Sequence, residues 1–326
     1  MSFVDPIALD DLAPLGPIFA DPNVVLVLHA GDNDLTEFKR RYGFTFASIF
    51  DTSIAARFLG VRALGLDALL EQWLGVALPP SRQKDDWSIR PLSPSQEDYA
   101  AADVLHLFAL KSRLTDELRT IGRLTWVEEE CAVLAVQEIP ERGVDPDGYL
   151  RVKGARDLSP RGLGVLREVY ETRDALARSA DRPPFKIVGD EALLKLAIAM
   201  PASQAEMAQV PGCTPRVVGR WGPSLLEAIA RGRTLDESVL PVLKKSPRPP
   251  GNPVAARRAD ALKRWRTEAA ERFGLDPGVL LPNRVISAIA DAGPANVGAL
   301  AAVDGMRRWR VGALGAELVG VIAATR

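Results

Sequence analysis

Two kinds of hydrophobic pattern divide this chain. In its first third, short apolar runs alternate with segments of helical spacing, whereas from about residue 158 apolar residues recur at helical intervals between Pro and Gly turns. The clearest run, Val24 to Leu28, is typical of a strand buried on both faces. Alternating strands and helices indicate an α/β domain. We therefore predict an α/β part followed by an all-α part, and a chain that is mostly helical.

Acidic residues follow the strand predicted at Val24–Leu28. Asp32 and Asp34 stand just after its end and open a predicted helix. Open α/β sheets bind their ligands at the carboxyl ends of strands, which favours a functional role. The alternative is that Asp32 or Asp34 simply caps the helix. This stretch alone does not decide between the two interpretations.

A second helix carries another pair of polar side chains. Ser93 is predicted as its N-cap and Pro94 as its first residue. Tyr99 and Asp103 are four residues apart and therefore share one face of this helix. A hydroxyl and a carboxylate on one face can bind a metal ion and orient its water, although such pairs are common by chance. Gly60 and Gly75 are predicted to end the two helices before it.

The C-terminal half contains an internal repeat. A shift of 93 residues aligns Pro201 with Pro294, Gly212 with Gly305, and Ile229 with Ile322. Near the start of each copy the shift that aligns Leu166 with Leu262 is 96, which predicts three residues fewer in the second copy, around residues 181–184. A repeat of this length indicates two copies of one small helical domain. Ser159-Pro160 and Asp190 are predicted helix starts in the first copy.

These patterns predict five segments. They are an α/β domain at 1–125, an acidic helical connector at 126–155, helical domains at 156–235 and 257–326, and a Pro-rich basic linker at 236–256. In the connector, the run Glu128-Glu129-Glu130 is predicted to be solvated. In the last domain, the spacing of Trp265 with Leu262 and Phe273 places its ring in the core.

Composition limits the class of protein. With 326 residues, 47% of them hydrophobic, the chain can form ordinary cores in two or three domains. It lacks the run of roughly 18 apolar residues that crosses a membrane, and its start does not resemble a signal peptide. Cys131, Cys213 and the two histidines have no metal-like spacing. We therefore expect no membrane partner, no zinc, buried free thiols and a cytoplasmic location.

The net charge of −1 conceals an asymmetry. Residues 1–155 carry 15 Lys and Arg against 24 Asp and Glu, whereas residues 156–326 carry 26 against 18. A basic excess over a whole region is typical of a polyanion-binding protein, and charged helix surfaces are the alternative explanation. The nucleic-acid-binding candidates are Lys84, Arg216, Arg220, Arg231, Arg233, Lys244, Lys245, Arg248, Lys263 and Arg264.

Short motifs in the first part occur in a characteristic order. They are His29-Ala30 with Asp34-Leu35, Phe50-Asp51-Thr52, Lys84 with Asp86-Trp87, Arg90-Pro91-Leu92-Ser93, and Tyr99 with Asp103. Together they resemble ribonuclease D, a family of 3′–5′ exonucleases, and the resemblance runs through residues 1–125. It implies a ribonuclease H-like exonuclease fold, Mg²⁺ or Mn²⁺ as cofactor, and trimming of RNA 3′ ends.

One family motif has no counterpart here. The family's first motif, Asp-x-Glu on its first strand, would lie upstream of Phe3, so we expect a truncated exonuclease domain. The resemblance gives Asp34 and Asp103 metal-binding roles and lets Tyr99 position the attacking water. Two metal ions held close together need several carboxylates to offset their repulsion. We therefore expect impaired or absent catalysis, and we interpret Asp5 as part of a turn and not as a substitute.

Both repeats resemble the HRDC domain, a helical module of RecQ helicases that occurs in tandem in ribonuclease D. The residues that carry this resemblance are Asp190-Glu191-Ala192-Leu193-Leu194, Val210-Pro211-Gly212 and Trp221-Gly222 in the first copy, and Leu281-Pro282-Asn283-Arg284, Val303-Asp304-Gly305 and Gly315 in the second. It implies an auxiliary role in binding nucleic acid, either RNA, single-stranded or structured, or DNA. Some HRDC domains contact protein instead.

Three hypotheses follow. The chain is an exonuclease that trims RNA, a non-catalytic nucleic-acid-binding protein, or a protein-interaction scaffold. Salt-dependent binding of RNA without turnover favours the second hypothesis.

Overall fold

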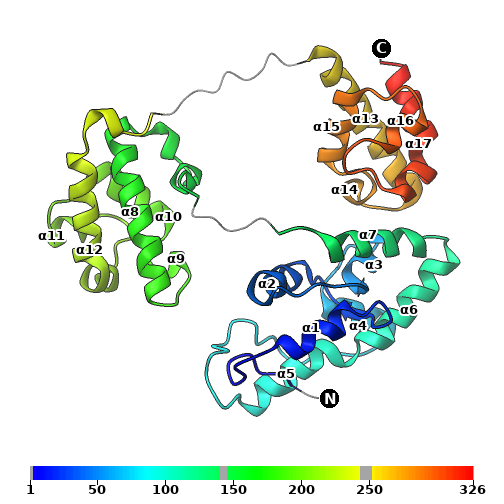
Figure 1. The fold of residues 1–326 in the computed structure, drawn as a ribbon, viewed down its shortest axis with the longest axis horizontal. Coiled ribbons are helices and arrows are strands. Elements are labelled where there is room, and N and C mark those ends of the chain that lie inside the picture. The colour runs from blue at the N-terminus through cyan, green and yellow to red at the C-terminus, as the bar shows by residue number, and fades with distance from the viewer. Residues whose placement is uncertain (1–2, 140–144, 243–251, 326) are drawn as a thin grey trace. The chain divides into compact units, whose positions relative to one another are not determined.

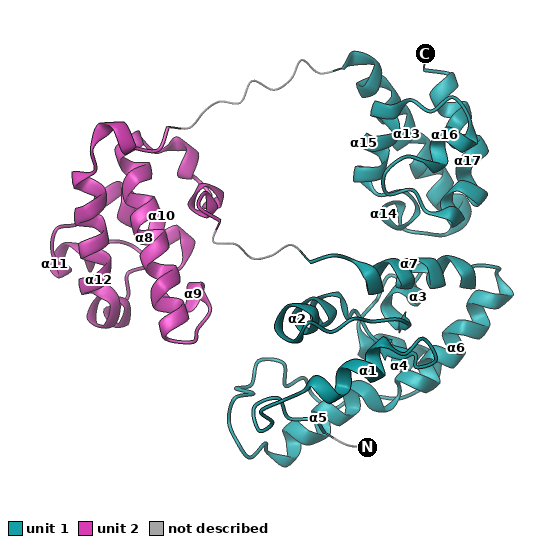
Figure 2. Cartoon of the chain, in the orientation of Figure 1, with its two compact units in different colours: residues 1–141, 249–326 teal, residues 142–248 magenta. Residues whose placement is uncertain are grey.

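A computed structural model describes residues 3–139, 145–242 and 252–325. The chain divides into two compact units, residues 1–141 with 249–326, and residues 142–248 (Figure 2). The first unit combines the α/β segment with the second helical repeat, and the second unit contains the first repeat (Figure 1). Each unit has its own cluster of buried apolar residues.

The sheet of the first unit is small. Within the described residues it has two strands, β1 (Leu26–Leu28) and β2 (Ile49–Asp51), which pair in parallel with Leu26 opposite Ile49. β2 is buried, whereas β1 is half-buried and the preceding Val24 and Val25 are 40% and 39% exposed. The prediction of a strand buried on both faces at Val24–Leu28 is therefore wrong. In the described part of the chain, β1 has a strand neighbour on one edge only.

Helices cover this sheet and continue into the connector. They are η1 (Ala13–Leu15), α1 (Gly16–Ala20), α2 (Asp32–Tyr42), α3 (Thr52–Phe58), α4 (Leu66–Leu74), α5 (Pro94–Leu105), α6 (Leu107–Thr120) and α7 (Leu124–Val136). Helix α6 packs on β1, α3 and α4 through Leu110, Leu114 and Leu118, which are fully buried. Helix α7 packs on β2 and α3, so the first part of the predicted connector, residues 126–141, belongs to the first unit, and the rest belongs to the second.

Local capping signals position the helices that carry the candidate residues. Ser93 caps α5 by accepting a hydrogen bond from the Gln96 N–H, and Pro94 is its first residue, both as predicted. The Gln96 side chain completes a capping box with Ser93. Gly60 and Gly75 follow helix ends with φ of +81° and +64°, also as predicted. The N-cap of α2 is Gly31, and Asp32 and Asp34 make no side-chain cap there. The capping interpretation of these two carboxylates is therefore wrong.

The two repeats have the same five helices. The first contains α8 (Pro160–Ser179), α9 (Pro184–Ile187), α10 (Asp190–Ala199), α11 (Gln204–Met207) and α12 (Pro215–Thr234), preceded by η2 (Gly148–Arg151) and η3 (Ala155–Asp157) and followed by η4 (Glu237–Val239). The second contains α13 (Pro253–Phe273), α14 (Pro277–Leu280), α15 (Asn283–Ala292), α16 (Val297–Ala301) and α17 (Arg308–Ala323). Ser159 caps α8 as predicted.

A single shift of 93 residues relates the two copies throughout, so the predicted three-residue loss is wrong. Arg173 donates to Asp190 at 2.5 Å, and the equivalent Arg266 donates to Asn283 at 2.9 Å. Asp181 and its equivalent, Gly274, both have positive φ at the end of the first long helix. The apparent shift of 96 arose because Leu166 and Leu262 are both buried without being equivalent.

The prediction that Asp190 caps the start of α10 is wrong. Gly189 occupies the N-cap position, and the Asp190 carboxylate pairs with Arg173, whose side chain is 5% exposed. Trp265 is half-buried: it packs against the core cluster, and its indole N–H donates to Glu317 at 2.8 Å. Part of the predicted linker, including Lys244, Lys245 and Arg248, lies outside the described residues.

Among the helices that the structure describes, none is both long enough and apolar enough to span a membrane.

Candidate active site

Helix α5 brings Tyr99 and Asp103 together. The Tyr99 side chain is buried against the Trp87 ring, with centroids 6.1 Å apart, and its hydroxyl donates to the Asp103 carboxylate. Burial raises the pKa of Asp103, an effect that the Tyr99 hydrogen bond and the nearby His29 partly oppose. Tyr99 and Asp103 therefore share one face of this helix, as their spacing predicts.

His29 faces the same site from the end of β1. Its Nδ1 lies 2.9 Å from the Thr52 hydroxyl, which itself donates to the Leu28 carbonyl at 3.0 Å. Because the hydroxyl proton is used there, His29 Nδ1 must be the donor to Thr52. Burial lowers the pKa of His29, against the negative charges of Asp51 and Asp103. A neutral imidazole is therefore favoured beside Asp103.

Asp51 organises the turn that carries His29, Ala30 and Gly31. Its side chain is buried, and it accepts hydrogen bonds from four backbone N–H groups: Ala30 at 3.1 Å, Gly31 at 2.9 Å, Ser53 at 2.8 Å and Ile54 at 3.2 Å. One carboxylate thus caps α3 and fixes the loop into α2. Asp51 belongs to a motif of the family resemblance, but the sequence alone predicted no role for it. Its position between a buried strand and a helix was the available signal.

Asp34 lies in the first turn of α2, in an acidic setting. Burial and the charges of Asp32 and Asp51 raise the pKa of Asp34. Among the described residues, no group of three or more His, Cys, Asp or Glu side chains is arranged to hold a metal ion. The two predicted metal ligands, Asp34 and Asp103, therefore do not fit a two-metal centre by themselves.

Asp5, which we interpreted as a turn residue and not as a substitute for the missing carboxylates, forms an ion pair with Arg90. Its carboxylate receives two hydrogen bonds from the Arg90 guanidinium, Nε to Oδ2 at 2.5 Å and Nη2 to Oδ1 at 2.7 Å. Those bonds lower the pKa of Asp5 to about 2. Asp5 also accepts the Ile7 N–H in a turn, which agrees with its interpretation as a turn residue.

The predicted nucleic-acid-binding lysines and arginines differ in whether they pair with acidic side chains of the protein. Lys84, Arg216, Arg220, Arg233, Lys263 and Arg264 are exposed. Arg231 is held by Glu168 at 3.0 Å and by the Thr172 hydroxyl at 3.1 Å, and Lys263 lies 3.3 Å from Asp260. Arg220 lies over the Trp221 ring at 4.6 Å. Arg216, Arg220 and Arg233, all on α12 and all exposed, are the better candidates for contacts with phosphate.

Comparison with known proteins places this architecture in a family. Residues 2–119 match the 3′–5′ exonuclease family, and residues 162–229 and 255–322 each match the HRDC domain. Ribonuclease D of Pseudomonas paraeruginosa is 32% identical over 325 residues, covering 98% of this chain and 84% of that protein. This chain belongs to the ribonuclease D family. The two HRDC matches are themselves 93 residues apart, in agreement with the register of the helices.

Other ribonuclease D proteins agree with this assignment. Ribonuclease D of Granulibacter bethesdensis is 35% identical over 292 residues, covering 89% of this chain and 73% of that protein. The crystal structure of Escherichia coli RNase D, described as an exoribonuclease involved in structured RNA processing, matches with a TM-score of 0.68 and 27% identity. That match covers 98% of this chain and 84% of the other. The family and the exonuclease-plus-HRDC fold predicted from sequence are confirmed.

Proposed function

We propose that this 326-residue chain binds RNA at a ribonuclease D-type site but cleaves it weakly or not at all. The observation that supports this is the set of contacts around the two carboxylates that match the family pattern. Asp103 is engaged with Tyr99 and His29, whereas Asp34 lies among Asp32 and Asp51. Two carboxylates leave most of the charge of two divalent ions uncompensated.

The residues present still define what the site can do. The Tyr99 hydroxyl is oriented by Asp103, and the imidazole of His29 is held in one tautomer by Thr52. Such a fixed set of donors and acceptors can orient a water molecule or the terminal hydroxyls of an RNA strand. Binding and orientation therefore remain available to this chain without the full set of acidic groups.

The basic C-terminal half supports the binding part of the proposal. A polyanion is attracted to its excess of Lys and Arg and repelled by the acidic first half. Single-stranded RNA is the substrate class that agrees best with family membership, and structured RNA or DNA is the alternative to be tested beside it. A role as a protein scaffold is the second candidate. It is favoured because Arg307 and Arg310 of the second HRDC domain pair with Glu130 of this same chain, so an HRDC domain here does contact protein.

A labelled-RNA assay tests the proposal. A single-stranded RNA whose 5′ end is labelled is incubated with the chain and Mn²⁺, with EDTA in a parallel reaction and Asp103→Asn as the control variant. We expect gel-shift binding by both proteins and no more than trace shortening by either. Robust stepwise shortening from the 3′ end that requires Mn²⁺ and disappears in Asp103→Asn would contradict the catalytic part. Absence of RNA binding at low salt would contradict the rest.

A further inference from the structure

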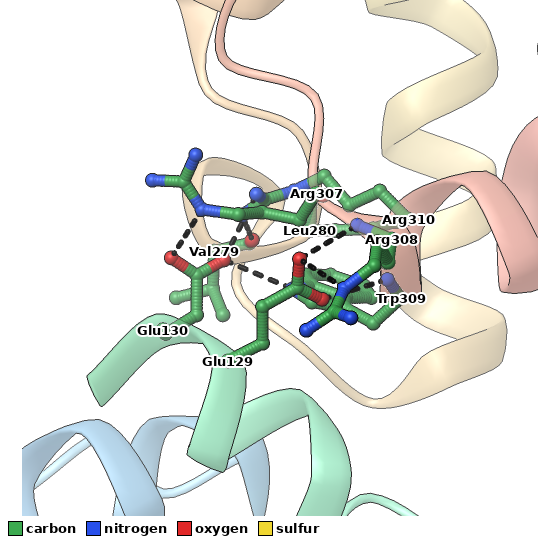
Figure 3. A network of polar contacts seen from close by, with 8 residues as sticks. All are labelled: Glu129, Glu130, Val279, Leu280, Arg307, Arg308, Trp309 and Arg310. Atoms are coloured by element: carbon green, nitrogen blue, oxygen red, sulfur yellow. Dashed lines mark hydrogen bonds and ion pairs between the residues drawn. The ribbon is translucent and has the colours of Figure 1, made fainter. Parts of the chain in front are cut away.

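The start of helix α17 is capped by a residue from α7. Glu129 accepts hydrogen bonds from the Arg308 N–H at 2.8 Å and the Trp309 N–H at 2.9 Å (Figure 3). These are the first two N–H groups of α17, which have no partner inside the helix. The N-cap residue Arg307 supplies no side-chain cap. A carboxylate about 180 residues earlier in the chain therefore does the work of an N-cap.

Glu130 strengthens the same contact. It accepts the Trp309 indole N–H at 2.9 Å, Arg310 Nη1 at 2.9 Å and Arg307 Nε at 3.3 Å. Arg310 is 4% exposed and also donates to the carbonyl groups of Leu280 and Val279. The prediction that Glu128–Glu130 form a solvated run is therefore wrong for Glu129 and Glu130, whose side chains are 15% and 18% exposed. Both carboxylates have partners far away in the sequence.

Aromatic packing and a close backbone approach extend this interface. The Trp309 ring stacks on Trp126 at 4.5 Å and meets Phe58 edge-on at 5.3 Å. Arg123 donates to the carbonyl groups of both Phe58 and Phe273. At Gly60 the backbone comes so close to the Gly274 carbonyl oxygen that a Cβ would overlap it. The second HRDC domain thus contacts the nuclease segment at two places, the start of α17 and the end of α13.

The first HRDC domain lacks the residues that match the start of α17. With the shift of 93, the first-copy equivalents of Arg307, Trp309 and Arg310 are Thr214, Arg216 and Val217. Thr214 caps its own helix by accepting the Val217 N–H at 3.3 Å.

We infer that residues Trp126, Glu129 and Glu130 of α7 form a docking surface that selects the second HRDC copy. The surface recognises a helix start without a cap of its own, a tryptophan in its first turn and two flanking arginines. A self-capped helix with arginine in place of tryptophan, as in the first copy, does not fit it. The two copies therefore have different roles. The second completes the nuclease unit, whereas the exposed arginines of the first copy remain free to bind other ligands.

The test asks whether the docked copy stays attached after the chain is cut. A protease site replaces residues 244–249, the full chain is purified and cleaved, and the two pieces are run on a size-exclusion column at tens of micromolar. We expect the C-terminal piece to co-elute with the remainder. Because a lost N-cap weakens a structure by about 0.5–2 kcal/mol, Glu129→Ala should raise the dissociation constant by about 2- to 30-fold. Separation of the wild-type pieces would overturn the inference.

A graft separates docking from folding. The triple variant Arg307→Thr, Arg308→Pro and Trp309→Arg gives α17 the self-capped start of α12. We expect the released piece to remain helical by circular dichroism and yet to elute alone. Glu128→Ala is the matched control, since Glu128 is exposed on the same run, and it should co-elute like the wild type. Co-elution of the grafted piece, folded and undiminished, would show that Glu129 and Trp309 do not select the copy.

Discussion

The carboxylates of this chain differ sharply in burial and in the number of hydrogen bonds they accept. Asp51 accepts four N–H groups within a buried turn, whereas Asp32, three residues from His29, is exposed. Asp51→Ala would leave these four donors unsatisfied and remove the cap of α3. With lost caps and unsatisfied donors each costing on the order of 1–2 kcal/mol, we expect destabilisation of about 3 kcal/mol or more in urea unfolding. Asp32→Ala should stay within about 0.5 kcal/mol. Equal effects would contradict the role given to Asp51.

His29 should make stability depend on pH in a defined direction. Its pKa in the folded protein is lowered from 6.5, so the unfolded chain takes up a proton first as pH falls. Stability is therefore retained above pH 6.5 and declines below it, where folding must exclude that proton. In His29→Gln this decline is removed, and the stability difference between wild type and variant should shrink between pH 7.5 and 5.5. A difference that stays constant across urea curves at both pH values would refute this.

At the scale of elements, two glycines at helix ends form a natural pair of probes. Gly60 and Gly75 both have positive φ, but only Gly60 faces another backbone, that of Gly274. Gly75→Ala should cost about 1 kcal/mol from backbone strain alone. Gly60→Ala should cost clearly more, because the added Cβ also forces the second HRDC domain away. Chemical unfolding of both variants measures the difference, and similar costs would mean that the close approach is unimportant.

The sequence predicted helix ends correctly where the interacting residues are close together in the chain, and wrongly where they are far apart. Ser93, Pro94 and Gly75 act on residues within a few positions, so the sequence pattern alone predicted their helix ends correctly. Asp190 and Glu129 looked like a cap and a solvated charge because their partners, Arg173 and the start of α17, lie 17 and about 180 residues away. In the site, the placement of Tyr99 and Asp103 on one face of a helix was predicted from their spacing. The hydrogen bonds that Asp51 accepts join two separate segments of the chain, and the sequence pattern did not predict them.

The whole molecule should bind nucleic acid mainly through charge. We expect the logarithm of RNA affinity to fall with the logarithm of salt by about 0.7 per phosphate contact for single strands. Replacing Arg216, Arg220 and Arg233 together by alanine should lower this slope by about 2, because each is exposed. Arg231→Ala is the control, since Arg231 is held by Glu168 and Thr172. Filter-binding titrations at several salt concentrations measure the slope, and an unchanged slope in the triple variant would locate the contacts elsewhere.

The discontinuous first unit also has a consequence for synthesis on the ribosome. Residues 1–141 emerge first, the first HRDC domain follows, and residues 249–326 come last. Domains generally fold as units while the chain is being made, so the first HRDC domain can finish before the nuclease unit does. Until α17 is translated, Trp126, Phe58, Glu129 and Glu130 lack the partners that α17 provides in the completed fold. A nonsense mutation after residue 141 would therefore release a nascent product with an unfinished nuclease half, a substrate for chaperones and proteases.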